Sequence, residues 1–218
     1  MKYTTYIFDF DYTLVDATMG IVDSFNYAFK QLGLEPGSRD RIRKTVGMPL
    51  RDAFYELSGS SDKLLAEHFV SHFKDKADKV MTASTVLFND TIPVLSQIKE
   101  RSCNIAIVTN KNHSRINEAM DKFNMHELID YIVGIEDVEA PKPSPEGLIK
   151  TIEHFGIPKQ YTLFVGDTIM DASTAANAQI DFAAVLTGTT PAQAFKSLPH
   201  IFIAKNLTEL IKHVALKN

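Results

Sequence analysis

The sequence has one cysteine, Cys103, and no tryptophan among its 218 residues. A lone cysteine excludes an intrachain disulfide and a cluster of thiolate metal ligands, and it fits a reducing compartment. No run of 18 apolar residues occurs, and residues 1–6 lack the apolar stretch of a secretory signal, so we expect a cytoplasmic protein. The sequence has 23 Lys+Arg and 27 Asp+Glu residues, and the resulting net charge of −4 gives no electrostatic footprint for nucleic acid.

What the sequence does contain is a globular composition, with 44% hydrophobic and 23% charged residues. At the usual ~150 residues per domain, the length allows one elaborated domain or two small ones. Short apolar runs rich in β-branched or aromatic residues alternate with helix-like segments, and they cover residues 6–8, 104–109, 161–165 and 182–186. This alternation predicts an α/β fold in which helices cover both faces of a parallel sheet.

Polar residues follow three of these runs directly. They are Asp9 after the first run, residues 109–111 after the second and residues 166–168 after the third. In an open α/β sheet, ligands bind outside the carboxyl ends of the strands. We therefore expect three strand ends to direct polar side chains at one crevice.

Residues 16–83 contain no convincing strand, but apolar residues recur there at helical spacing. The repeated positions are Ile21, Phe25, Ala28, Phe29 and Leu32, and then Leu64, Leu65, Phe69, Phe73 and Ala77. We expect residues 16–83 to form a helical domain inserted into an α/β domain of residues 1–15 and 84–218. An insertion that leaves from a polar strand end and returns beside it would lie over the crevice as a lid.

Two acidic pairs carry the strongest chemical signal. Asp9 and Asp11 follow an apolar strand and, on extended chain, would share one face, where one could act as nucleophile or metal ligand and the other as acid/base. Asp167 and Asp171 are four residues apart, a spacing that would put both on one face of the first turn of a helix. Carboxylates clustered without His or Cys suit Mg²⁺. Turn formation and helix N-capping would also account for these pairs.

Two further segments could serve a phosphate. Thr109 and Asn110, with Lys111, end a predicted strand and could supply a hydroxyl, backbone amides and a charge to a phosphate, although a simple turn also favours these residues. Lys142 lies between two prolines, which fix where its side chain starts and so could aim its ammonium at a phosphate or a carboxylate. A solvated loop lysine is the alternative.

In this order, the paired aspartates, the threonine, the proline-flanked lysine and the Gly-Asp-x-x-x-Asp segment resemble the four motifs of the haloacid dehalogenase superfamily of phosphohydrolases. The resemblance spans about residues 5–190. The chain is most similar to members with a helical cap after the first motif, a group that contains phosphoglycolate phosphatase, an inorganic pyrophosphatase and β-phosphoglucomutase. The resemblance implies a Rossmann-like three-layer core with a parallel sheet and an inserted helical cap domain.

The resemblance also implies a covalent mechanism. Asp9 would be the nucleophile and a Mg²⁺ ligand. Asp11 would protonate the leaving alcohol and then activate water, while its backbone carbonyl binds the metal. Dehalogenases and phosphonatases of this superfamily lack an aspartate at the position of Asp11, so its presence implies phosphate-ester chemistry.

The remaining motif residues would hold the phosphate and the metal. Thr109 and the backbone amide of Asn110 would bind the oxygens of the transferring phosphoryl group. Lys142 would offset negative charge on the nucleophile and the phosphate. Asp167 would complete the metal site, with Asp171 as a ligand or a supporting residue.

Two positions are expected to shape the substrate pocket. Tyr12 replaces the glycine that the family usually has, so either the turn differs or the tyrosine projects toward the cap and trims the pocket. Arg51 lies in a segment that resembles the substrate-facing part of phosphoglycolate phosphatase caps, where it could pair with a second anionic group of the substrate. It could equally lie on a solvated helix face.

The sequence thus predicts a Mg²⁺-dependent phosphatase that hydrolyses a small phosphomonoester through an aspartyl phosphate, with phosphoglycolate expected first. The alternatives are a pyrophosphatase or nucleotidase, a phosphomutase of the β-phosphoglucomutase type, and a phosphate-binding regulator without turnover. We expect a small phosphorylated metabolite as partner, with no nucleic acid polymer and no membrane, and a monomer or homodimer.

Overall fold

The computed structural model describes residues 2–216, which divide into two compact units. One unit combines the chain up to Val15 with the chain from Leu87 onward, and the other is the inserted segment Asp16–Val86. The sequence placed the second boundary at residue 84, whereas the inserted unit extends a few residues further because its last helix continues through Ser84. Within the described residues, no helix is both long and apolar enough to span a membrane.

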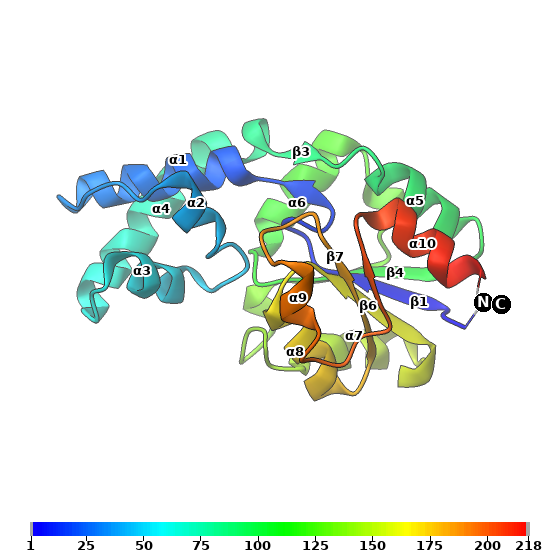
Figure 1. The fold of residues 1–218 in the computed structure, drawn as a ribbon. Coiled ribbons are helices and arrows are strands. Elements are labelled where there is room, and N and C mark those ends of the chain that lie inside the picture. The colour runs from blue at the N-terminus through cyan, green and yellow to red at the C-terminus, as the bar shows by residue number, and fades with distance from the viewer. Residues whose placement is uncertain (1, 217–218) are drawn as a thin grey trace. The chain divides into compact units, whose positions relative to one another are not determined.

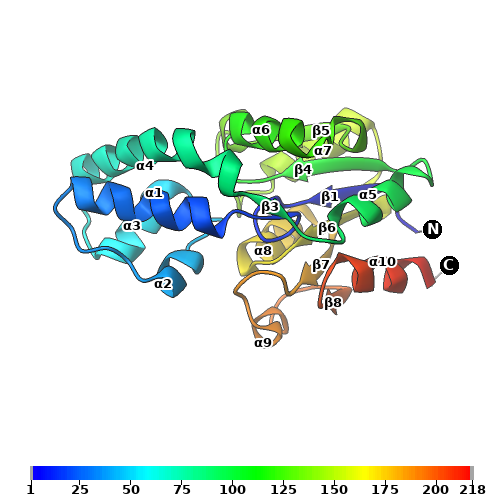
Figure 2. The same cartoon turned by 90° about the horizontal axis from the view of Figure 1, so that it is seen from above.

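The discontinuous unit is built on a six-stranded parallel sheet (Figure 1). Its strand order is β5-β4-β1-β6-β7-β8, which can be followed from top to bottom in Figure 2. Its strands are β1 (Thr5–Phe8), β4 (Asn104–Val108), β5 (Tyr131–Val133), β6 (Thr162–Gly166), β7 (Asp181–Val185) and β8 (Phe202–Ala204). The α/β class and the parallel sheet that the sequence predicts are confirmed. In β1, Phe8 lies beside Ile107 of β4 and Val165 of β6, so these three central strands end at the same level.

Helices cover both faces of this sheet, because alternate residues of each buried strand enter different cores. Tyr6 and Phe8 of β1 pack in one core with α5 (Thr91–Lys99), α6 (His113–Phe123) and α10 (Leu207–Leu216). Ile7 packs in the other core with α7 (Glu146–Phe155), α8 (Ile169–Ala178) and α9 (Ala192–Phe195). Three short 3-10 helices, η1 (His126–Leu128), η2 (Ile135–Asp137) and η3 (Lys159–Tyr161), lie in the connections.

The inserted unit is helical, and its helices are α1 (Thr18–Gln31), α2 (Arg39–Arg43), α3 (Leu50–Ser58) and α4 (Lys63–Ser84). Helices α1 and α4 run side by side (Figure 2). Their shared core is a cluster of phenylalanine rings in which Phe69 lies 5.2 Å from Phe25, 5.3 Å from Phe29 and 5.0 Å from Phe54, centroid to centroid. Leu64 departs from the predicted pattern, because it lies in the first turn of α4 with 64% of its surface exposed.

The two short strands β2 (Val15–Asp16) and β3 (Val86–Leu87) pair with each other where the chain passes between the units. Cys103 lies just before β4 and is buried, with its sulfur 3.8 Å from the carbonyl oxygen of Tyr3. Burial raises the pKa of this thiol. The only cysteine of the chain is therefore a core side chain.

Candidate active site

Asp9 is the first residue after β1, and the chain turns sharply just beyond it. Its amide still donates to the carbonyl of Val165 in β6 at 2.9 Å, which fixes Asp9 at the carboxyl end of the sheet. The carbonyl of Phe10 then accepts hydrogen bonds from the amides of Leu14 and Val15, and the amide of Tyr12 donates to the carbonyl of Val15. Extended chain therefore ends at Phe10, and Asp11 lies inside a tight turn rather than on a straight continuation of the strand.

Tyr12, which stands where the family usually has glycine, adopts the left-handed backbone conformation that glycine tolerates best, with φ of 60°. The turn thus keeps a conformation suited to glycine although a tyrosine occupies it. Only 2% of the residue's surface is exposed, and Thr187, just after β7, donates from its hydroxyl to the Tyr12 carbonyl. A buried ring and a hydrogen-bonded carbonyl hold the strained residue in place.

Lys142 joins two of the aspartates in a buried ion-pair network. Its Nζ atom lies 2.8 Å from Asp9 Oδ1 and 2.5 Å from Asp171 Oδ1. All three side chains are at most 4% exposed. The structure therefore brings Lys142 to the carboxylates, and the alternative of a solvated loop lysine is wrong.

The 140–145 loop is held in register by Asn110, which follows the end of β4. The side-chain oxygen of Asn110 accepts from the amide of Lys142 at 2.9 Å, and its side-chain nitrogen donates to the carbonyl of Lys142 at 3.4 Å. The neighbouring Thr109 is 6% exposed, and its amide donates to the Val133 carbonyl of β5 at 3.1 Å. Sequence reasoning considered only the backbone amide of Asn110 and missed the positioning role of its side chain, because no local pattern links residues 32 apart.

Asp167 and Asp171 come from the turn between β6 and the start of α8. The expectation that both lie on the first turn of a helix is wrong, because α8 begins at Ile169 and Thr168 is its N-cap. Asp171 completes a capping box with Thr168, whose hydroxyl accepts from the Asp171 amide while Asp171 Oδ2 accepts from the Thr168 amide and hydroxyl. Asp171 is thus both a capping residue and a partner of Lys142.

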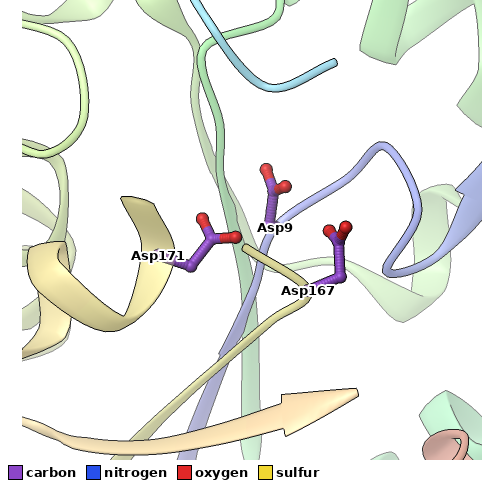
Figure 3. Close-up of side chains that lie close together, drawn as sticks. All are labelled: Asp9, Asp167 and Asp171. Carbon is purple, nitrogen blue, oxygen red and sulfur yellow. The ribbon is translucent and has the colours of Figure 1, made fainter. Parts of the chain in front are cut away.

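Asp167 is held differently. Its Oδ1 atom accepts from the Thr13 hydroxyl at 3.2 Å, while Oδ2 is buried without a hydrogen-bond partner among the described residues. A Cβ atom at Gly188 would overlap Asp167 Oδ2, so a residue without a side chain is needed there for the carboxylate to fit. Figure 3 shows the carboxylates of Asp9, Asp167 and Asp171 gathered at the ends of the strands.

Burial dominates the electrostatics of this cluster. It raises the pKa of Asp9 to about 6, with a further increase from Asp171 and an opposing decrease from Lys142. Burial, followed by the charges of Asp171 and Asp9, holds the pKa of Asp167 well above its ordinary value. Burial alone would lower the pKa of Lys142, but the carboxylates of Asp171 and Asp9 outweigh it and raise that pKa. Three carboxylates share one buried ammonium, which leaves the cluster short of positive charge.

These residues fit a divalent cation with a preference for oxygen ligands. Carboxylate oxygens of Asp9, Asp167 and Asp171 all lie within 4.8 Å of one another. The unpartnered Oδ2 of Asp167 carries a desolvation penalty that a cation would remove. Since both oxygens of Asp171 already accept hydrogen bonds, Asp9 and Asp167 are the residues best placed to be direct Mg²⁺ ligands.

Asp11 and Arg51 take partners outside this cluster. Both carboxylate oxygens of Asp11 accept hydrogen bonds from Lys111 Nζ, at 2.9 and 2.8 Å. Arg51 lies on α3 of the inserted unit, where it is largely exposed and pairs with Glu67 of α4 at 3.6 Å. The structure therefore places Arg51 on a solvated helix face, and a contact with substrate stays a prediction.

The family model for haloacid dehalogenase-like hydrolases matches residues 6–185, which include all four motifs described above. The chain belongs to this family. Pyrophosphatase PpaX of Halalkalibacterium halodurans is 25% identical over 100% of this chain and 99% of its own length. Phosphoglycolate phosphatase of Psychrobacter arcticus is 28% identical over 88% of this chain and 87% of its own.

Among solved structures, a haloacid dehalogenase-like hydrolase from Bacteroides fragilis matches with a TM-score of 0.93 and 37% identity, over 96% of this chain and 100% of that one. The resemblance drawn from the four motifs is thus confirmed, as is the fold that it implies. Family and relatives together identify an enzyme, a phosphatase of the haloacid dehalogenase-like group. The relatives' names differ in the phosphate compound that they specify.

Proposed function

We propose that this phosphatase hydrolyses a small phosphomonoester in two steps through a phosphoaspartate at Asp9. The observation that carries the proposal is the buried Asp9 carboxylate, which has the ammonium of Lys142 at 2.8 Å and a carboxylate oxygen of Asp167 within 4.8 Å. Such a nucleophile is held in one place, and the carboxylates around it outnumber the single ammonium until a cation binds. Phosphoryl transfer depends mostly on this kind of positioning and charge neutralisation.

In the first step, a carboxylate oxygen of Asp9 attacks phosphorus and the ester bond between phosphorus and oxygen breaks. Asp11 gives its proton to the departing alcohol oxygen. In the second step, Asp11 takes a proton from water, the water oxygen attacks phosphorus and the bond to Asp9 breaks, which releases inorganic phosphate. Mg²⁺ held by Asp9 and Asp167 would neutralise charge on the phosphate oxygens.

The other motif residues support the same phosphoryl group. Lys142 offsets the negative charge of Asp9, and the Thr109 hydroxyl and the Asn110 amide bind phosphoryl oxygens. Arg51 is the residue we assign to the leaving group, through a second anionic group of the substrate. The partner is a small phosphorylated metabolite rather than a nucleic acid polymer or a membrane, and the enzyme works in the cytoplasm as a monomer or homodimer.

Phosphoglycolate is the substrate we expect first, since two relatives are named phosphoglycolate phosphatase. Pyrophosphate is the second candidate, because other relatives that cover nearly the whole chain are named pyrophosphatase PpaX. The two compounds differ in their leaving groups: phosphoglycolate releases an alcohol, and pyrophosphate releases a second phosphate. Cleavage of both would use the same Asp9.

The test is release of inorganic phosphate from phosphoglycolate, pyrophosphate, nucleoside monophosphates and hexose phosphates, with Mg²⁺ and with a chelator. Asp9→Asn removes the nucleophile, and Asp130→Asn serves as the matched control, since Asp130 immediately precedes β5 and so lies at the amino-terminal end of the strands, away from the site. We expect Mg²⁺-dependent release from the wild type and from Asp130→Asn, and none from Asp9→Asn. Phosphate transfer between sugar hydroxyls without release would favour the mutase, and binding of phosphate without turnover would favour a regulator.

A further inference from the structure

Lys111 forms a bidentate ion pair with Asp11, the proposed acid/base residue. Its Nζ atom donates to both oxygens of Asp11, at 2.9 and 2.8 Å, and the two side chains are 10% and 11% exposed. An ion pair this sheltered from water is screened far less than one on the surface. No other ion pair is described for Asp11, so Lys111 fixes the direction of its carboxylate.

The contact is built by two neighbouring strands. Lys111 follows the end of β4, where its amide donates to the Thr109 hydroxyl at 3.3 Å, and its ammonium lies 5.8 Å from the centre of the Phe10 ring. Asp11 lies in the turn that follows β1, the strand paired with β4. Both ends of the ion pair are thus anchored on the sheet.

Two roles are open to a lysine at this place. It could bind the transferring phosphoryl group directly, or it could act through Asp11. The cluster around Asp9 already contains an ammonium, that of Lys142, whereas the ammonium of Lys111 is engaged by both oxygens of Asp11. The geometry favours the second role.

We propose that Lys111 is a positioning residue that holds the Asp11 carboxyl group in line with the leaving oxygen and, later, with the attacking water. The inference rests on the proposed phosphatase mechanism and adds a residue to it. Lys111 neither gives nor receives the proton, which passes between Asp11 and the alcohol or water. Its loss should slow only those steps in which Asp11 must transfer a proton.

Two esters with different leaving groups separate a first step that needs a proton from Asp11 from one that does not. A p-nitrophenyl phosphate releases a stable phenolate that needs no proton, whereas an alkyl phosphate such as phosphoglycolate releases an alcohol that does. In Lys111→Met and Lys111→Gln, we expect the pre-steady-state burst of p-nitrophenolate to stay within about threefold of wild type. Alkyl phosphate turnover should fall by about 10²-fold, the lower end of the usual contribution of a positioned acid/base group.

Lys99→Met is the matched control, because Lys99 forms a more exposed lysine–aspartate pair with Asp130, 2.6 Å long, at the amino-terminal end of the strands, away from the site. It should change neither reaction. In an Asp11→Asn background, Lys111→Met should cause no further loss with the alkyl ester, because a residue that acts through Asp11 has nothing left to position. Circular dichroism confirms that each variant is folded.

An equal fall of the p-nitrophenolate burst and of alkyl turnover would overturn the proposal and assign Lys111 to the phosphoryl group. A further loss in the Asp11→Asn background would do the same. If the wild type releases phosphate from neither ester, the proposed function itself fails and the inference falls with it. Turnover by the wild type with a uniform loss in the variants overturns the positioning role alone.

Discussion

Tyr12 occupies a backbone conformation that favours glycine, and two opposing effects decide what a glycine would do there. The left-handed conformation costs about 1–2 kcal/mol for a residue with a Cβ atom. Removal of a buried aromatic ring costs about 3–5 kcal/mol. We therefore expect Tyr12→Gly to lower the free energy of unfolding by about 1–4 kcal/mol, measured by chemical denaturation.

Gln179 provides the control for this comparison. It has nearly the same φ, 59°, at the C-cap of α8, but its side chain is exposed. Gln179→Gly relieves the same strain without emptying a core, so we expect it to leave stability unchanged or to raise it by up to ~1 kcal/mol. A rise in stability in Tyr12→Gly would show that the tyrosine ring contributes little.

Asp9 should make stability fall as the pH rises. Its pKa is raised to about 6 in the folded protein, against an ordinary value of 3.8. Between about pH 4 and pH 6 the folded state holds a proton that the unfolded state has lost, so this favourable contribution disappears over that window. We expect the wild type, in chelator, to lose about 3 kcal/mol relative to Asp9→Asn between pH 4 and pH 7. A difference between the two proteins that is constant with pH would contradict the raised pKa.

At the scale of elements, the aromatic side chain of Phe69 is central to the packing of helix α4. Phe69 is fully buried and lies within 5.3 Å of three other phenylalanine rings of the inserted unit. We expect Phe69→Ala to destabilise that unit by about 3–5 kcal/mol, measured by chemical denaturation. Leu64→Ala, an exposed residue on the same helix, should stay within about 0.5 kcal/mol of wild type.

The central strands of the sheet could be predicted from the sequence, and the two edge strands could not. Four buried strands were visible because both faces of a parallel strand are covered and its residues form a continuous apolar run. The outer strands β5 and β8 were missed, since each has only three residues and its first two are partly exposed. Short strands of this kind leave no periodicity to detect.

The site shows the same division between local and distant information. Asp9, Asp167 and Lys142 became candidates because each stands at a position where a strand ends or a loop is rigid, and the resemblance to the family then assigned their roles. The start of α8 was misplaced. A spacing of four residues between Asp167 and Asp171 fits two helical residues, but it fits equally well an Asp167 that precedes the N-cap and an Asp171 inside the helix. The pairing of Asp11 with Lys111 joins residues 100 apart and was not predicted.

For the molecule as a whole, the charge balance of the buried cluster predicts a response to metal. A ligand that binds only the folded state at 100 times its dissociation constant stabilises it by about 2.7 kcal/mol. We therefore expect saturating Mg²⁺ to raise the thermal midpoint by about 5–10 °C over the value in chelator. Scanning calorimetry measures the shift.

Asp167→Asn should abolish this stabilisation, because it removes the carboxylate whose Oδ2 atom has no hydrogen-bond partner. In chelator the same variant should be more stable than wild type, since it removes a buried charge that Asp171 and Asp9 repel. The matched control, Asp130→Asn, should keep the full response to Mg²⁺. A midpoint that rises equally in Asp167→Asn would place the ion elsewhere.

Cys103 has a practical consequence. As the only cysteine of the chain, with its sulfur in the core and the pKa of its thiol raised by burial, it will react slowly with maleimides and other thiol reagents. Cysteines introduced at the exposed positions Ser71 and Gln160, one in each unit, would therefore take up a pair of fluorophores without competition. Energy transfer between them would report, in the otherwise native protein, how far apart the two units stand before and after a phosphate ester binds.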